Sequence, residues 1–316
     1  MGNTTKTFTL LFMLVNLEIA NAEACEKSIK PEDYLVCSGS DVTYYGSDFQ
    51  GPACAVGNVN VTQFALDSRY SNNCQSWSVG GNYKQGTGSA NGNITVGGNV
   101  SLDAVNVNGQ LQHGGNLSLS VSKVREGLKK IDGVATKSAI ENTWKFFEDQ
   151  SKSMADAKVA LKPMIGNNTL TFYSQGQFQT FQIDAKELKR ASVIRLNGIC
   201  TTPFIINIRG EEATISETDI QISKTLQGCM GNIFFNFPDA KSVTLKKSGD
   251  SKNGVPATIL APQANLNFTD DLVTGGVFAK KITGNGQVNY TKIAWPKSGT
   301  NQMSGALPES SSAVSK

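Results

Sequence analysis

Few side chains in this sequence are placed for acid–base or nucleophilic chemistry. The adjacent carboxylates are Asp270-Asp271 and Glu211-Glu212. A polysaccharide hydrolase or lyase needs carboxylates or basic groups that converge on one cleft, but neighbouring residues of an extended strand point to opposite faces. Both pairs are therefore interpreted as solvated turns. His113 is the only histidine, so a Ser/His/Asp set is missing, and the chain is predicted not to be an enzyme.

Cofactor, metal and nucleic-acid sites are not indicated either. The glycine-rich segment 284–286 is followed by neither Lys-Ser/Thr nor a helix start, which makes it turn material rather than a phosphate loop. No Cys-x-x-Cys occurs, so the cysteines fit a metal site poorly. Charged residues make up 17% of the chain with a net charge of +3, too few and too evenly mixed for a nucleic-acid or membrane-surface footprint.

The cysteines suggest disulfides instead, because their number is even and the chain has the features of a secreted protein. The six are Cys25, Cys37, Cys54, Cys74, Cys200 and Cys229. Six cysteines allow 15 pairings. Proximity alone favours Cys25 with Cys37, Cys54 with Cys74, and Cys200 with Cys229, and each closed loop would contribute about 3 kcal/mol.

The N-terminus has the layout of a secretory signal peptide. Residues 1–22 contain Lys6, an apolar run from Phe8 to Val15 and a small-x-small ending at Ala20-Asn21-Ala22. The rival interpretation is a short hydrophobic strand. No later apolar run is long enough to span a bilayer. The mature protein is therefore expected outside the cytosol, secreted or at the cell surface, and not integral to a membrane.

Seven Asn-x-Ser/Thr sequons follow the signal sequence. In a eukaryotic secretory pathway they would be candidate glycan acceptors on exposed loops, whereas in a bacterium they would carry no such meaning. The acceptor residues are Asn60, Asn93, Asn99, Asn116, Asn167, Asn267 and Asn289.

The strongest pattern is a repeat. Gly-Gly-Asn occurs at 80, 97 and 114, in steps of 17 residues, between short alternating apolar runs. Short strands with glycine corners at a fixed period are typical of a β-solenoid, in which each strand pairs with its copy one coil along. The glycines would allow positive φ or close backbone approach. The predicted corner residues are Gly57, Asn58, Gly80, Gly81, Asn82, Gly97, Gly98, Asn99, Gly114, Gly115 and Asn116.

Aromatic residues cluster near the first predicted coils. They are Tyr44, Tyr45, Phe49, Trp77 and Tyr83. Two interpretations stay open: a carbohydrate-stacking surface at the end of the solenoid, or a cap that seals the terminal coil, as repeat proteins require.

Residues 122–162 have a different period, with apolar residues at three- and four-residue steps. They predict one or two long amphipathic helices, stopped by Pro163, that pack along the solenoid. The chain then returns to strand patterns, interrupted by a short helix over 185–190, and Ala261 and Ala279 lie 18 residues apart, close to the earlier step. The predicted divisions are a signal peptide (1–22), a solenoid domain (23–295) and a disordered tail (296–316).

These segments resemble the choice-of-anchor A family, whose predicted fold is that of ice-binding-like adhesive domains. The resemblance covers residues 34–293, and its matching segments are Phe49-Gln50-Gly51, the residues 55–59, the VGGN copies near 79 and 96, IFFNFPDAKSVTLKKSG (233–249) and GVPATILAPQANLNFTDDLVTGGVFAKKITGNGQVNY (254–290). It implies an extracellular, non-enzymatic β-solenoid with a helix along its side. Leu307-Pro308 is not followed by Thr-Gly or by an apolar segment, so neither a sortase signal nor a lipid anchor is expected.

The resulting hypothesis is a secreted adhesin or surface-coat protein that binds an extracellular polymer, a cell-wall or host-surface component, a matrix component or a glycan. A polysaccharide-active β-helix enzyme is one alternative. Ice binding is the other, and the family analogy says that it needs a flat array of threonines. Thr95, Thr169, Thr171 and Thr258 do not recur at the coil period, which weighs against it. Fold alone does not decide among these functions.

Overall fold

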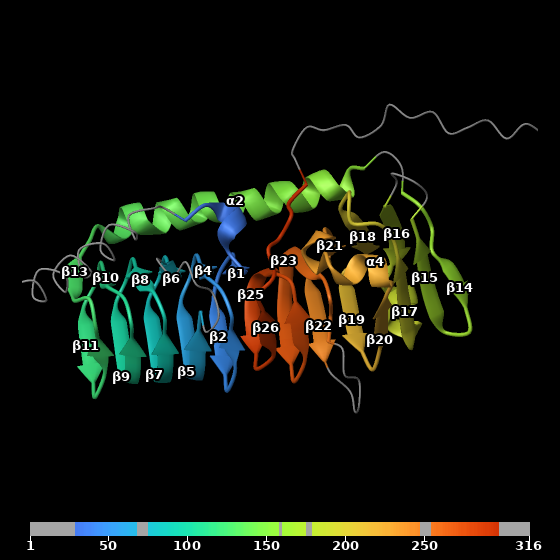
Figure 1. Cartoon of the computed structure of the whole chain (residues 1–316). Helices are drawn as coiled ribbons and strands as arrows, with labels where there is room; N and C mark the ends of the chain where they lie inside the picture. Colours follow the sequence, from blue (N-terminus) through green and yellow to red (C-terminus); the bar gives the residue numbers. More distant parts are fainter. Residues whose placement is uncertain (1–28, 68–74, 158–159, 175–178, 247–253, 297–316) are drawn as a thin grey trace, which may run out of the picture.

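The protein is mainly β, a discontinuous solenoid with one long helix along its side, as the sequence predicts (Figure 1). The computed structural model describes residues 29–67, 75–157, 160–174, 179–246 and 254–296. The predicted signal peptide and C-terminal tail lie outside these described residues, as do Cys25 and Cys74. Each coil contributes strands to three faces of the solenoid, which we name faces A, B and C.

Face A is a continuous row of parallel strands. In spatial order these are β13 (Leu128–Lys130), β10 (Leu111–His113), β8 (Asn93–Val96), β6 (Gln75–Val79), β4 (Ala53–Ala55), β1 (Val36–Ser38), β25 (Val277–Gly284), β23 (Thr258–Thr269), β21 (Ile233–Asn236), β18 (Phe204–Arg209) and β16 (Thr180–Asp184).

Face B follows the next corner of each coil. Its strands are β11 (Leu117–Ser120), β9 (Val100–Val107), β7 (Tyr83–Ala90), β5 (Val59–Leu66), β2 (Val42–Tyr45), the second parts of β25 and β23, then β22 (Ser242–Lys246) and β19 (Glu212–Ser216).

Face C completes the coil. It contains β12 (Lys123–Val124), the second parts of β9, β7 and β5, β3 (Asp48–Phe49), β26 (Gln287–Asn289) and β24 (Leu272–Thr274). In the C-terminal half, strands that alternate along the chain with those of faces A and B form a separate four-stranded sheet of β20 (Asp219–Ile222), β17 (Val193–Asn197), β15 (Thr169–Tyr173) and β14 (Met164–Gly166).

The solenoid is discontinuous because the chain starts in its middle. Strand β1 pairs in parallel with β4 on one side and with β25, from the far end of the chain, on the other. The N-terminal half runs from β1 outward to β13, α2 (Gly133–Ala155) returns along the side, and the C-terminal half runs from β16 back to β25 (Figure 1). At 1.5 Å per residue, this 23-residue helix is about 35 Å long.

The helix begins later and ends earlier than the predicted 122–162. Residues 123–130 form β12 and β13 instead, because Val124 pairs with Val107 and Leu128 with Leu111, which extends the apolar rows by one more coil. The first helical turn is fixed by Asp132, whose side chain accepts hydrogen bonds from the backbone N–H of Val134 and Ala135. The apolar residues spaced three and four apart before Gly133 therefore belong to strands of one further solenoid coil and not to a helix.

The short elements lie at corners and ends. They are η1 (Pro31–Asp33), α3 (Ala185–Arg190), α4 (Lys224–Gln227) and η2 (Met230–Asn232). The predicted short helix over 185–190 is thus present as α3, and the predicted step between Ala261 and Ala279 is a strand-to-strand register.

Two layers of apolar residues hold the fold together. The inward residues of the coils form one core, and a second cluster lies between the outer side of face A and α2. In this second cluster the ring of Phe147 stacks on Phe278 with centroids 4.3 Å apart, and Trp295 packs against both. The amphipathic helix therefore covers face A, as expected.

Two disulfides lie within the described residues. Cys37 bonds Cys54, its direct neighbour on the adjacent parallel strand, with the Cα atoms 4.4 Å apart. This corrects the pairings of Cys37 with Cys25 and of Cys54 with Cys74, because coil stacking makes residues 17 positions apart neighbours in space. Cys200 bonds Cys229, the pair that proximity favours.

Candidate functional site

The Gly-Asn motifs lie at the corner between faces A and B, stacked one above another. The backbone N–H groups of Gly81, Gly98 and Gly115 each donate to the glycine carbonyl one coil before, at 2.7–2.9 Å. Beside them the amide side chains form a ladder, in which the Oδ1 atom of Asn82 accepts from the backbone N–H of Asn99 at 2.8 Å and Asn99 does the same for Asn116. The ladder starts at Asp41, which accepts from Asn58.

Close backbone approach, not positive φ, explains these glycines. None of the corner glycines has a positive φ. A Cβ atom on Gly97 would lie 2.5 Å from the carbonyl oxygen of Gly80, and one on Gly98 would lie 2.7 Å from that of Gly81. Such distances are shorter than van der Waals contact, so only glycine lets the coils stack at this corner. The repeats are architectural and leave the ligand-binding surface elsewhere.

Face B presents regularly placed polar groups on its outward side. We call its outward side the polar face. Its central row runs in strand register across nine strands and consists of Thr214, Thr244, Asn267, Thr283, Thr43, Asn60, Lys84, Ser101 and Ser118. These side chains are exposed or partly exposed, while the alternate residues point into the core. Adjacent strands in a sheet are about 4.8 Å apart, so the row presents hydroxyl and amide groups at that spacing.

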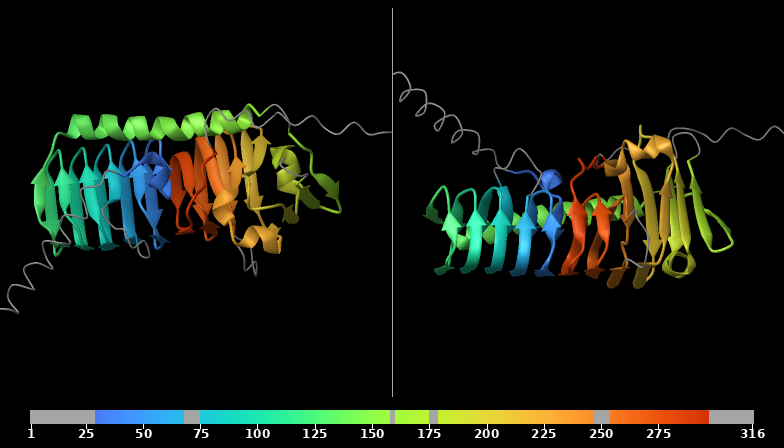
Figure 2. Two further views of the ribbon diagram at one scale, coloured as in Figure 1. Left: turned by 45° about the horizontal axis from the view of Figure 1, so that its top comes forward. Right: turned by 60° about the horizontal axis from the view of Figure 1, so that its bottom comes forward.

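No helix of the described part of the chain covers the polar face. The helix contacts strands of face A and runs along one side of the solenoid, leaving the other sides open (Figure 2). A second row, two residues further along each strand, contains Ser216, Thr269, Tyr45, Thr62, Asp103 and Ser120. In this row the ring of Tyr45 is 58% exposed.

The predicted aromatic stacking surface is wrong for four of its five residues. These four are at most 2% exposed and point into the core, and they are Tyr44, Phe49, Trp77 and Tyr83. The hydroxyl of Tyr44 donates to the carbonyl of Gly286. They do not cap a terminal coil either, because β2 lies in the middle of the solenoid, where the two halves meet. Only Tyr45 is exposed, since alternate residues of one strand point to opposite sides.

The sequons occupy different environments. Asn60 and Asn267 lie in the central row of the polar face, and Asn99 and Asn116 belong to the corner ladder. Asn167 lies in the exposed turn before β15. Asn93 accepts from the backbone N–H of Gln110, and Asn289, the last residue of β26, is partly buried. Whether any carries a glycan stays a prediction.

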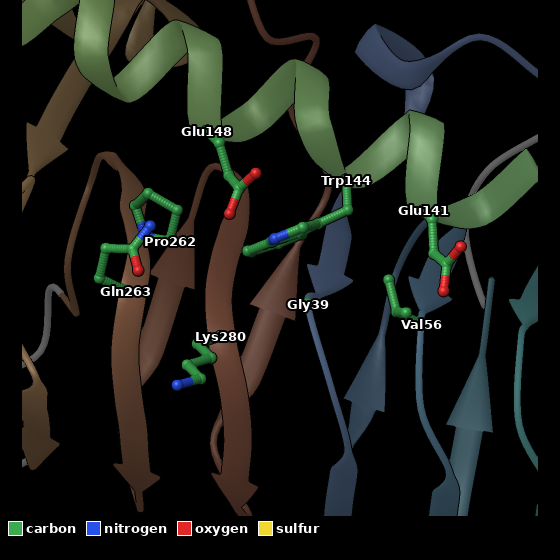
Figure 3. Close-up of a pocket in the computed structure, with 8 residues that line it drawn as sticks. All are labelled: Gly39, Val56, Glu141, Trp144, Glu148, Pro262, Gln263 and Lys280. Carbon is green, nitrogen blue, oxygen red and sulfur yellow. The ribbon is translucent and has the colours of Figure 1, made fainter. Parts of the chain in front are cut away.

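A shallow cavity of about 310 Å³ lies beside the helix, where the two halves of the solenoid meet (Figure 3). Glu141, Trp144 and Glu148 reach down from α2, and Lys280 faces them from the coil below. The indole of Trp144 rests over Gly39 and is only 8% exposed, so it offers little surface for stacking. Glu141 and Glu148 lie two helical turns apart, so their backbones are separated by about 10 Å along the helix axis.

The carboxylates considered from the sequence do not converge. Glu211 forms an ion pair with Lys241 at the rim of face B. Asp270 accepts from Asn285 at a corner between faces B and C. His113 contacts the carbonyl oxygen of Gly115 through Nδ1 at 2.9 Å, so it belongs to the corner column. Among the described residues, no group of three or more His, Cys, Asp or Glu could hold a metal ion.

The perturbed pKa values belong to the core rather than to a cleft. Burial raises the pKa of Asp67 to about 7, against one hydrogen bond from the Ser76 hydroxyl that lowers it. Burial also raises the pKa of Tyr34 to about 12 and that of Tyr44 well above its usual range. Acid–base catalysis needs such groups at a substrate-accessible cleft, and none of these three side chains is exposed.

The family comparison agrees with this architecture. A family model described as "Putative Ice-binding-like adhesive domain" matches residues 32–290. The chain belongs to this family. The match does not carry the choice-of-anchor A name, which stays a prediction. No curated protein and no solved structure matches the chain. Within the described residues, no helix is long and apolar enough to cross a membrane.

Proposed function

We propose that this adhesive-domain protein is a secreted, non-enzymatic adhesin whose polar face binds a hydroxyl-rich extracellular polymer, such as a cell-wall, matrix or surface glycan. The observation that carries the proposal is the central row of the polar face, with small polar side chains in register on nine strands. The two disulfides support an oxidising, extracellular location.

The chemistry of the polar face suits a glycan better than a protein partner. Hydroxyl and carboxamide groups both donate and accept hydrogen bonds, as sugar hydroxyls do. Protein interfaces depend on buried aromatic and apolar anchors, whereas among the described residues Tyr45 is the only exposed large hydrophobic side chain on the two outward rows of the polar face. Each polar contact is weak, but a polymer can engage many of them at once, and this multivalency raises the overall affinity.

The test is binding of the labelled mature protein to a panel of glycans, cell-wall polysaccharides and matrix proteins. Asn60 lies in the centre of the polar face, and Asn142 lies on the exposed side of α2. We expect saturable binding to a glycan that Asn60→Lys weakens at least about tenfold, because a strongly hydrated ammonium group would have to be desolvated. The matched substitution Asn142→Lys should leave binding unchanged. Equal effects of the two substitutions, or retention on no polymer, would reject the proposal.

Ice binding is the second candidate, and one observation favours it. Thr214, Thr244, Thr283 and Thr43 share the central row, although the threonines singled out from the sequence do not. Thr258 is buried in the core, and Thr169 and Thr171 lie on the separate sheet. Asn267, Asn60 and Lys84 interrupt the threonine row, which favours the glycan. Thermal hysteresis in a freezing assay would assign the face to ice, and turnover of a glycan in the panel would favour an enzyme.

A further inference from the structure

The two ends of the solenoid are finished differently. At the C-terminal-half end, inward residues of the last face A strand, Phe181 and Ile183, are 1% exposed. Helix α3 takes the place of a face B strand there and buries Ala185 and Leu188. Leu161 adds a bridge to Phe181. The core is therefore closed at this end, as terminal repeats require for solubility.

The other end is bare. In the second-last coil, the inward residues Leu102 and Leu111 are at most 1% exposed. Their counterparts one coil along, Leu119 and Leu128, are 38% and 51% exposed. No described residue covers them. Strand β13 pairs on one side only, with β10, so alternate backbone N–H and C=O groups along its outer edge have no strand partner among the described residues.

The bare end is also basic. Its last coil carries Lys123, Arg125, Lys129 and Lys130 against Glu126, while the neighbouring Asp132 caps the helix. Lysines on an edge discourage pairing with uncharged or basic strands. A second copy of the chain would place these four basic residues against each other, or against the capped end, where Lys186, Lys189 and Arg190 outnumber Asp184 and Glu187. Self-association is therefore disfavoured, whereas an acidic strand would be attracted.

We propose that the bare end, Leu117 to Lys130, is a docking edge for an extended, acidic segment of a partner protein, which adds a strand along β13. Backbone hydrogen bonds to β13 would supply affinity, alternate apolar side chains would cover Leu119 and Leu128, and acidic side chains would pair with Lys129, with Lys123 of the same coil adding to the attraction. The open strand edge is that of β13 on face A, whereas the polar face is the outward side of face B, so this inference does not depend on the ligand of that face.

The probe is a synthetic peptide of alternating valine and glutamate, compared with one of alternating valine and lysine. Binding is measured by fluorescence anisotropy, and the site is located by amide hydrogen exchange of the full mature chain. We expect the acidic peptide to bind at least about tenfold more tightly, with an affinity that falls as salt rises. Amides of residues 117–131 should gain protection.

Charge reversal at the bare end tests the role of the basic residues. The double variant Lys123→Glu, Lys129→Glu should bind the lysine peptide more tightly than the glutamate peptide. The control is the double variant Lys145→Glu, Lys152→Glu on α2, which changes the net charge equally and should keep the preference for the glutamate peptide. Protection outside residues 117–131, or no binding of the acidic peptide, would overturn the proposal. A dimer in sedimentation that Leu128→Lys dissociates would overturn it in favour of a second copy.

Discussion

The two halves of this solenoid hold parallel strands together by different means. In the N-terminal half, neighbouring coils are 17 residues apart at four of the five steps on face A, and glycine corners bring their backbones into contact. In the C-terminal half, the paired strands are separated by steps of 25, 29, 24 and 18 residues. The first half is specified by repetition, and the second by side-chain packing.

The polar ladders show the same contrast. In the N-terminal half the ladder of asparagines is exposed and contacts backbone N–H groups at a corner. In the C-terminal half a buried ladder lies under α2, where Asn236 donates to Asn207 and to the carbonyl of Ser151, and Asn207 donates to the carbonyl of Met154. This second network fixes the helix to the irregular coils. A buried amide group that loses a hydrogen-bond partner destabilises the fold, so these asparagines tolerate substitution less well than the exposed ones.

The largest expected effect follows from removing a side chain that the C-terminal half relies on. Phe147 is fully buried and stacks on Phe278. Phe147→Ala should lower the free energy of unfolding by about 3–5 kcal/mol, through lost burial and an unfilled cavity. Urea denaturation measures it. Phe147→Leu retains most of the volume and should cost less than half as much. A loss below about 1 kcal/mol for the alanine variant would mean that α2 contributes little to stability.

The N-terminal half should respond to the opposite change, a methyl group added at a corner. Gly97→Ala brings a Cβ atom to 2.5 Å from the carbonyl oxygen of Gly80 and 2.8 Å from that of Gly133. We expect a loss of about 2–3 kcal/mol from overpacking, read from the urea midpoint. Gly166→Ala is the control, since its Cβ would meet nothing within 4 Å. If both variants are equally stable, close backbone approach does not explain the corner glycines.

The contrast between the halves explains what the sequence could reveal. A fixed period with glycine corners predicts a solenoid, and the corner residues lie where that period places them. The same period extends one coil beyond the last Gly-Gly-Asn, but residues 123–130 also satisfy helical spacing, so the spacing predicts a helix that begins before Gly133, where the structure begins it. The pairing of β1 with β25 has no local signal, because it joins the two ends of the domain.

The candidate site was harder to predict. Rows on the polar face unite residues from both halves, such as Thr214 and Asn60, and their alignment depends on the irregular steps of the C-terminal half. Periodicity alone cannot supply that register. Alternation along a single strand does indicate which aromatic residues are buried. Val42 and Tyr44 lie on the same, buried side of β2, while Tyr45 points to the opposite side. The burial of Cys37 and Cys54 as in-register neighbours follows from the 17-residue step itself.

The regular half contains one interruption, and it should be sensitive to pH. Ala53 pairs with Trp77, a step of 24 rather than 17 residues, and Asp67 lies buried in this coil with its pKa raised from 3.8 to about 7. A raised folded-state pKa means that the native state favours the protonated carboxyl. The corresponding stabilisation is complete below pH 3.8, declines as the pH rises, and is lost above pH 7 or so.

Asp67→Asn removes this titration. We expect the variant to be more stable than the parent by about 1–2 kcal/mol at pH 8, with the difference narrowing toward pH 5. Unfolding free energies at the two pH values measure it, and Asp103→Asn on the exposed side of β9 is the matched substitution. An unchanged difference between pH 5 and pH 8 would show that Asp67 does not titrate in this range.

The smallest effect tests the exposed ladder itself. Asn82 accepts a hydrogen bond from the backbone N–H of Asn99, and Asp41 plays the same part at the first rung with a carboxylate. Asn82→Ala leaves that N–H without its side-chain partner and should cost about 1 kcal/mol. Asn82→Asp keeps the acceptor oxygen and should be near neutral, because the ladder uses only Oδ1 at this contact. Thermal denaturation of both variants separates the two expectations. If the alanine and aspartate variants lose equal stability, the side-chain hydrogen bonds do not hold the coils in register at this corner, and the glycine contacts beside them do.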